Sequence, residues 1–173
     1  PTTFDGWGRI LEQVKGSVLL IYTANESAKI NLVKEIVLRG IDSSRLIFGE
    51  RLPKPEYLAR YRVADLFLDT LPYNAGTTAS DALRMGLPVL TCMGNSFVSR
   101  EAASVINAVN LPELITTDQE EYESLAIELA TNPEKLKTIK NKLVNNLPTV
   151  PLYDTPFFTR HLESAYLTMY DRY

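Results

Sequence analysis

The chain has 173 residues with a single cysteine, and its 18 basic residues nearly balance 21 acidic ones, giving a formal net charge of -3. A chain of this length buries the core of one domain without disulfides or a structural metal. The charge balance argues against nucleic acid and against an anionic membrane as partners. No apolar run approaches the ~20 residues that span a bilayer, and the polar opening is unlike a signal peptide, so we expect a cytoplasmic protein.

The first part of the chain alternates between helical and strand patterns. Apolar residues recur at helical spacing over 4–14, and Gly16 follows as a stop. Residues 17–23, SVLLIYT, are almost continuously apolar, as expected for a central parallel strand covered on both faces. Residues 27–39 carry apolar side chains on one side and charges on the other, which predicts a crossover helix ending at Gly40.

The same alternation continues to the C-terminus. Further strands are predicted over 45–49, 66–68, 89–91 and 114–116. Further helices are predicted over 53–62, 79–85, 98–109, 119–130, 133–146 and from 155 onwards. Strands and helices at these intervals predict an α/β fold with a doubly wound parallel sheet, a single Rossmann-like domain over residues 1–173.

One strand-to-helix junction carries the clearest functional signal. The turn-rich segment 72–76 follows a predicted strand, and Thr77 and Thr78 stand where the next helix begins. The first N–H groups of a helix have no intrahelical partner and the helix dipole is positive there, so anions bind at such a position. Gly76 allows a close backbone approach or a positive φ. The sequence therefore predicts a phosphate site at this end of the sheet, where ligands bind in open parallel sheets.

Asp81 extends this candidate site by one helical turn. It is placed to accept hydrogen bonds from a ribose diol, as acidic residues do in nucleotide-binding folds. A purely local explanation is equally open, with Thr77 as an N-cap and Asp81 as a partner of the helix dipole. The chain lacks a G-x-G-x-x-G fingerprint, which weakens a dinucleotide reading, and it shows no metal-ligand spacing.

Other candidate residues have ordinary structural explanations. Asp69 follows a predicted strand, and we expect it to cap the loop beyond. Lys54, Arg60 and Arg62 are expected on a solvated face. Cys92 ends an apolar run and is expected to be a buried core residue.

The block LDTLPYNAGTTASDALRMGLPVLTCMGNSFVSREAAS resembles the catalytic region of O-linked N-acetylglucosamine transferases, including SPINDLY-like bacterial relatives that follow tetratricopeptide repeats. The resemblance covers nearly the whole chain in the family's order. It implies the C-terminal, nucleotide-sugar-binding lobe of a B-type glycosyltransferase fold, with UDP in this lobe and no metal. It also implies that a second lobe and the repeats, which reach a protein acceptor, lie upstream and that residues 1–173 are a fragment of a longer protein.

The resemblance further implies which residues bind the UDP-sugar, expected to be UDP-N-acetylglucosamine. The family's Thr-Thr pair, which binds the diphosphate, matches Thr77 and Thr78. Its ribose-binding aspartate matches Asp81. A lysine and an arginine that border the uridine match Lys54 and Arg60.

Two further positions depart from the family pattern. Tyr57 matches a position that contacts the base, and its ring could stack on uracil. Gly76 stands where family members commonly place a histidine, so one polar contact to the diphosphate or sugar is lost or supplied otherwise. A lysine and a glutamine that reach the diphosphate in the family match no residue of this chain.

The parent would transfer N-acetylglucosamine or a related sugar from UDP to serine or threonine hydroxyls. The chain alone is expected to be inactive, because it lacks the clamping lysine and anything that positions the acceptor. Two alternatives stay open. One is a degenerate, non-catalytic module for protein interaction, in which Gly76 marks the decay of the site; the other is the donor lobe of a transferase that acts on a lipid or a small glycan.

Overall fold

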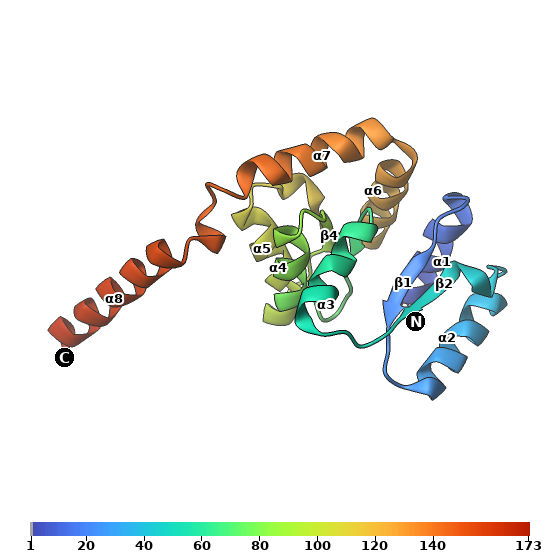
Figure 1. Ribbon diagram of the computed structural model, residues 1–173, viewed down its shortest axis with the longest axis horizontal. Helices are drawn as coiled ribbons and strands as arrows, with labels where there is room; N and C mark the ends of the chain where they lie inside the picture. The colour runs from blue at the N-terminus through green and yellow to red at the C-terminus, as the bar shows by residue number, and fades with distance from the viewer. Residues whose placement is uncertain (1) are drawn as a thin grey trace.

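The computed structural model describes residues 2–173, in which parallel strands alternate with helices (Figure 1). The strands are β1 (Leu19–Tyr22), β2 (Leu46–Gly49), β3 (Phe67–Leu68), β4 (Val89–Cys92) and β5 (Ile115–Thr116). Hydrogen bonds join β1 to β2, and separately join β3, β4 and β5 in that order, and every pair is parallel. The predicted α/β class is confirmed, with the strand hydrogen bonds divided between two groups.

The helices lie close to the predicted positions. They are α1 (Thr2–Gln13), α2 (Glu26–Leu38), α3 (Lys54–Arg60), α4 (Thr77–Arg84), α5 (Glu101–Ala108), α6 (Gln119–Thr131), α7 (Pro133–Asn146) and α8 (Thr155–Arg172). The side chain of Asp118 accepts the N–H of Glu121 and so caps α6, as predicted. Gly16 and Gly40 have φ values of 79° and 74° just beyond α1 and α2. These are left-handed conformations that favour glycine, which explains why both helices stop there.

The larger core surrounds β3, β4 and β5. Leu83 of α4, Val89 of β4, Ile106 of α5, Leu129 of α6 and Leu143 of α7 have no exposed surface. Helices from both sides therefore bury the central strand β4, whose four residues are all buried. This core fixes the position of α4, whose N-terminus opens at the surface.

Helix α1 links the two groups of strands. Its residue Ile10 packs in a cluster with Leu90 of β4, whereas its residue Leu11 packs with Ile36 of α2 and Leu46 of β2. The two faces of one amphipathic helix thus join the two sheets where no strand hydrogen bonds do.

The prediction that residues 17–23 form a strand covered on both faces is wrong. Residues Leu19 and Ile21 pack toward α1 and α2, but Leu20 and Tyr22 are 39% and 54% exposed, beside Ile47 at 44%. An apolar run cannot reveal whether its second face has a covering element, and in residues 2–173 that face of β1 and β2 remains exposed.

The C-terminal helix α8 extends away from the rest of the molecule (Figure 1). None of its residues is buried, although several are large and apolar. In the part of the chain that the structure describes, no helix combines the length and apolar character needed to cross a membrane.

Candidate functional site

Asp69 organises the loop between β3 and α4. Its carboxylate accepts the N–H of Ala75 at 2.7 Å and the hydroxyl of Thr91 at 2.6 Å. Its carbonyl oxygen accepts the Tyr122 hydroxyl at 2.9 Å. Asp69 is only 3% exposed, and this burial raises the pKa of its carboxyl group. The prediction that Asp69 caps the loop is therefore confirmed.

Asn74 anchors the same loop from within. It is buried, its Nδ2 donates to the carbonyl of Thr70 at 2.8 Å, and its backbone N–H donates to the carbonyl of Val98 at 2.8 Å. Its Oδ1 is buried with no hydrogen-bond partner among residues 2–173. Sequence reasoning treated Asn74 only as a turn residue, and the turn chemistry of asparagine was the available signal. Together Asp69 and Asn74 fix the point at which α4 begins.

Gly76 is the N-cap of α4, so Thr77 is the first helical residue and not the cap that the local explanation required. The backbone of Gly76 has a φ of -98°, so the suggested positive φ is wrong. A close approach to a phosphate stays a prediction; what the structure shows instead is that a Cβ built on Gly76 would overlap the carboxylate of Glu101. Thr77 and Thr78 are exposed, and no side chain caps this helix. Among residues 2–173, no side-chain hydrogen bond therefore caps the first N–H groups of α4, although the Glu101 carboxylate lies against the N-cap residue Gly76.

Lys54 and Asp81 join α3 to α4. Lys54 Nζ lies 2.7 Å from Asp81 Oδ2, with side-chain exposures of 63% and 25%. The same ammonium lies 5.0 Å from the centre of the Tyr57 ring, a cation–π contact. Three of the predicted nucleoside-binding residues thus lie together, one helical turn from the start of α4.

Tyr57 is held by a residue that sequence reasoning missed. The hydroxyl oxygens of Tyr57 and Tyr61 are 2.5 Å apart, and the rings meet edge to face with centroids 5.3 Å apart. Tyr61 in turn lies 6.3 Å from the ring of Phe67 in β3. Burial is the main cause of a raised pKa at Tyr61, and the hydrogen bond with the Tyr57 hydroxyl raises this pKa further. The available signal was the spacing of four residues, which places both tyrosines on one helix face.

Arg60 contacts the end of β2. Its guanidinium donates to the carbonyl of Glu50 at 2.5 Å and packs against Gly49, at the carboxyl end of β2. The expected solvated face therefore holds for Lys54 and Arg62, which are exposed, whereas Arg60 is half-buried against the backbone. Cys92 is buried as expected, and that burial raises the pKa of its thiol.

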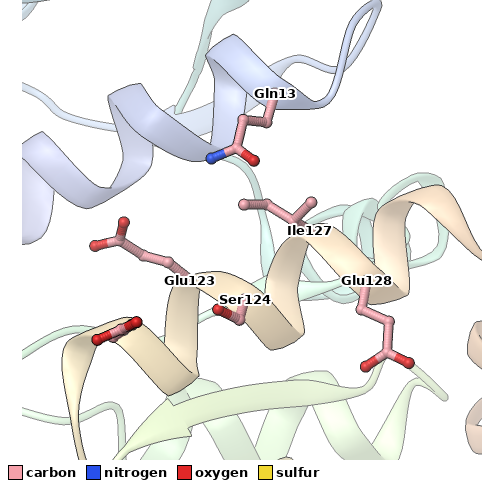
Figure 2. A pocket seen from close by; sticks show the side chains of 6 residues that line it. Gln13, Glu123, Ser124, Ile127 and Glu128 are labelled. Carbon is pink, nitrogen blue, oxygen red and sulfur yellow. The ribbon is translucent and has the colours of Figure 1, made fainter.

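A separate hollow of about 430 Å³ lies between α1 and α6 (Figure 2). Figure 2 shows Gln13 of α1 facing Ile127 of α6 across it, with glutamates along α6. The lining residues are Gln13, Glu120, Glu123, Ser124, Ile127 and Glu128. Three carboxylates and no basic residue line it, which makes it unsuitable for a phosphate. In residues 2–173 no group of acidic, histidine or cysteine residues could hold a metal ion.

Comparison with known proteins gives the family. The model of glycosyl transferase family 41 matches residues 1–162. A Caenorhabditis elegans UDP-N-acetylglucosamine–peptide N-acetylglucosaminyltransferase is 33% identical over the whole chain, which spans 15% of that protein. A probable enzyme of the same description from Arabidopsis thaliana is 30% identical over 99% of the chain, which spans 18% of that protein.

A solved structure of a similar protein supports the same family. A mutant of the Thermobaculum terrenum O-GlcNAc transferase superposes with a TM-score of 0.91 and 32% identity, over 98% of this chain and 33% of that one. The parallel α/β fold is thus shared with a glycosyltransferase. The chain belongs to glycosyl transferase family 41. Both the fold class and the resemblance inferred from the sequence are confirmed, and the chain spans less than a fifth of the first curated relatives it matches.

Proposed function

We propose that residues 1–173 form the UDP-sugar-binding lobe of a protein O-glycosyltransferase. The parent enzyme would transfer N-acetylglucosamine or a related sugar from UDP to serine or threonine hydroxyls of proteins. The names of the relatives support this activity. The observation that carries the proposal is the group of Lys54, Tyr57 and Asp81 beside the N-terminus of α4, which has no side-chain cap hydrogen bond among residues 2–173.

Each part of this group suits one part of the donor. The N–H groups and hydroxyls of Thr77 and Thr78 would bind the diphosphate, which the positive end of the helix dipole favours. Asp81 would accept hydrogen bonds from the ribose diol. The ring of Tyr57 would stack on uracil, and Lys54, whose ammonium lies over that ring, would border the base. In the structure Lys54 is bound to Asp81, so ribose binding would compete with this ion pair.

The same arrangement explains what this lobe would contribute to sugar transfer. Breaking the bond between sugar and phosphate leaves negative charge on the departing UDP, and the N-terminus of α4 would stabilise that charge. Positioning of the acceptor hydroxyl would come from the remaining part of a longer protein. We therefore propose that residues 1–173 alone bind the donor without catalysing transfer.

Calorimetric titration of residues 1–173 with UDP, with ADP and GDP as controls, tests the donor site. We expect uridine-selective binding near the millimolar range, about -4 kcal/mol. The variants Thr78→Ala and Asp81→Asn should weaken UDP, whereas Thr168→Ala and Asp171→Asn on the exposed helix α8 should not. Equal heats for all three nucleotides, or unchanged affinity in both site variants, would contradict the proposal and favour a non-catalytic interaction module. Peptide and glycan acceptors offered to the longer parent would then separate a protein transferase from a glycan transferase.

A further inference from the structure

Glu101 lies against Gly76, the N-cap residue of α4. It begins α5, which packs beside α4 in the core. Since a Cβ on Gly76 would overlap the Glu101 carboxylate, this carboxylate occupies the space that any side chain at position 76 would take. A negative charge therefore stands at the N-cap of α4, beside the N–H groups proposed to bind the diphosphate.

The charge of Glu101 is not neutralised by a neighbour. In residues 2–173 no ion pair joins it to a basic side chain. The nearby buried Asp69 carries a second carboxylate, and Glu101 contributes to the raised pKa of that group. The position of Glu101 in the first turn of α5 accounts for a favourable interaction with its own helix dipole. It does not account for the side chain filling the space above Gly76 of a different helix.

We propose that Glu101 sets the ligand preference of the donor site, so that the site disfavours the product UDP more strongly than the UDP-sugar. This inference rests on the proposed function. The terminal phosphate of UDP carries an ionisable oxygen with a second pKa near 6, so UDP bears about one more negative charge at pH 7.5 than a UDP-sugar, in which that oxygen is esterified. A fixed carboxylate repels the more charged ligand more strongly.

A weaker affinity for UDP would favour release of the product after each reaction. A site that binds both ligands through the same N–H groups would hold the product as tightly as the donor or more tightly, and product release often limits the rate. A carboxylate in the space above Gly76 weakens UDP selectively and leaves uncharged hydroxyl and amide groups of a sugar as hydrogen-bond donors to it. Glu101 of α5 thereby places a negative group where position 76 has no side chain of its own.

The test is the ratio of two dissociation constants, for UDP and for UDP-N-acetylglucosamine, measured by calorimetry on residues 1–173 at pH 7.5. The variant Glu101→Gln keeps the size of the side chain and removes the charge. We expect it to bind UDP about fivefold more tightly or better, with a smaller change for UDP-N-acetylglucosamine. Glu163→Gln, on the exposed helix α8, makes the same change in net charge and should leave the ratio unchanged.

Glu101→Asp provides a second variant, because it keeps the charge and withdraws it by one methylene from Gly76. We expect its ratio to fall between those of the wild type and Glu101→Gln. If the wild type binds UDP but the ratio stays the same in both Glu101 variants, the inference is overturned while the proposed function stands. If neither the wild type nor any variant binds a uridine nucleotide, the proposed function fails and takes this inference with it.

Discussion

Lys54 and Asp81 form a 2.7 Å ion pair that joins the first turn of α3 to the middle of α4. Because Lys54 is 63% exposed, the pair contributes little to folding, about 0–1 kcal/mol. An ion pair of small structural value between two residues proposed to bind one nucleoside is available for exchange with a ligand. The pair therefore keeps the two proposed binding groups close together in the structure without a ligand.

Lys54→Met should weaken UDP binding by about tenfold while changing the free energy of unfolding by less than about 1 kcal/mol. The reason is that Lys54 would lose its contacts to the nucleoside but only an exposed ion pair in the free protein. Calorimetric titration and urea unfolding measure the two quantities. Lys142→Met is the matched control, since it removes another exposed 2.7 Å pair, with Glu113. Equal effects of both variants on UDP affinity would exclude a direct role for Lys54.

Tyr57→Ala should weaken UDP binding by the value of one base–aromatic stack, about 1–3 kcal/mol. Tyr61→Phe should have a smaller effect of the same sign, because it removes only the hydroxyl that contacts Tyr57 and keeps the ring against Phe67. Titration of both variants with UDP measures this order. Tyr170→Phe on α8, where the side chain is 82% exposed, is the control. An unchanged affinity in Tyr57→Ala would show that no base stacks there.

The elements of the fold were predictable because their signals are local. Asp118 and Pro133 mark helix starts through their own backbone chemistry, and Gly16 and Gly40 mark helix ends in the same way. The exposed face of β1 was not predictable, because Leu20 looks the same in a sequence whether its face is covered or open. Burial of a strand depends on distant elements, which a local pattern does not record.

The residues of the candidate site also fall into those that local patterns predicted and those that depend on distant parts of the chain. Thr77 and Asp81 share one helix, so their spacing already placed them together, whereas the resemblance was needed to add Lys54 from α3. Glu101 and Gly76 lie 25 positions apart and meet only through the packing of α5 against α4, so nothing local indicated their contact. Contacts between helices that different strands position are the part of a site that a single sequence does not give.

The contribution of Asp69 to the stability of the fold should fall as pH rises through the range in which this carboxyl group ionises. Burial raises the pKa of this carboxyl above its usual 3.8, so the folded state holds the proton more tightly than the unfolded state. Between 3.8 and the raised value the folded chain binds more protons, and the contribution of Asp69 therefore decreases with rising pH. Urea unfolding of the wild type and Asp69→Asn from pH 3 to pH 7 measures this difference.

The difference in the free energy of unfolding between the wild type and Asp69→Asn should change in one direction only. Relative to Asp69→Asn, the wild type loses stability as pH rises, whatever constant difference the lost carboxylate contacts impose. Thr91→Val removes the hydroxyl hydrogen bond that lowers the pKa of Asp69. The loss of stability with rising pH should therefore continue to a higher pH in this variant than in the wild type. A constant difference between wild type and Asp69→Asn across this range would refute the shift.

Leu83→Ala should destabilise the fold by about 2–5 kcal/mol, because Leu83 is fully buried between α4 and the sheet and its truncation leaves a cavity. Leu38→Ala makes the same chemical change at a residue that is 79% exposed and should cost less than about 0.5 kcal/mol. Chemical denaturation gives both values. Similar losses in the two variants would mean that α4 does not depend on this core for its position.

Removal of residues 155–173 should leave the midpoint of thermal unfolding nearly unchanged, because α8 has no buried residue and an isolated helix of this length is marginal in water. The same truncation should reduce self-association, since α8 exposes Tyr166, Leu167, Met169 and Tyr170 by 60% to 82%. Calorimetric scanning and sedimentation equilibrium measure the two effects. A midpoint lowered by many degrees would show that α8 packs on the rest of the chain in solution. An unchanged association constant would instead point to the exposed face of β1 and β2, where Leu20→Lys is the next variant to test.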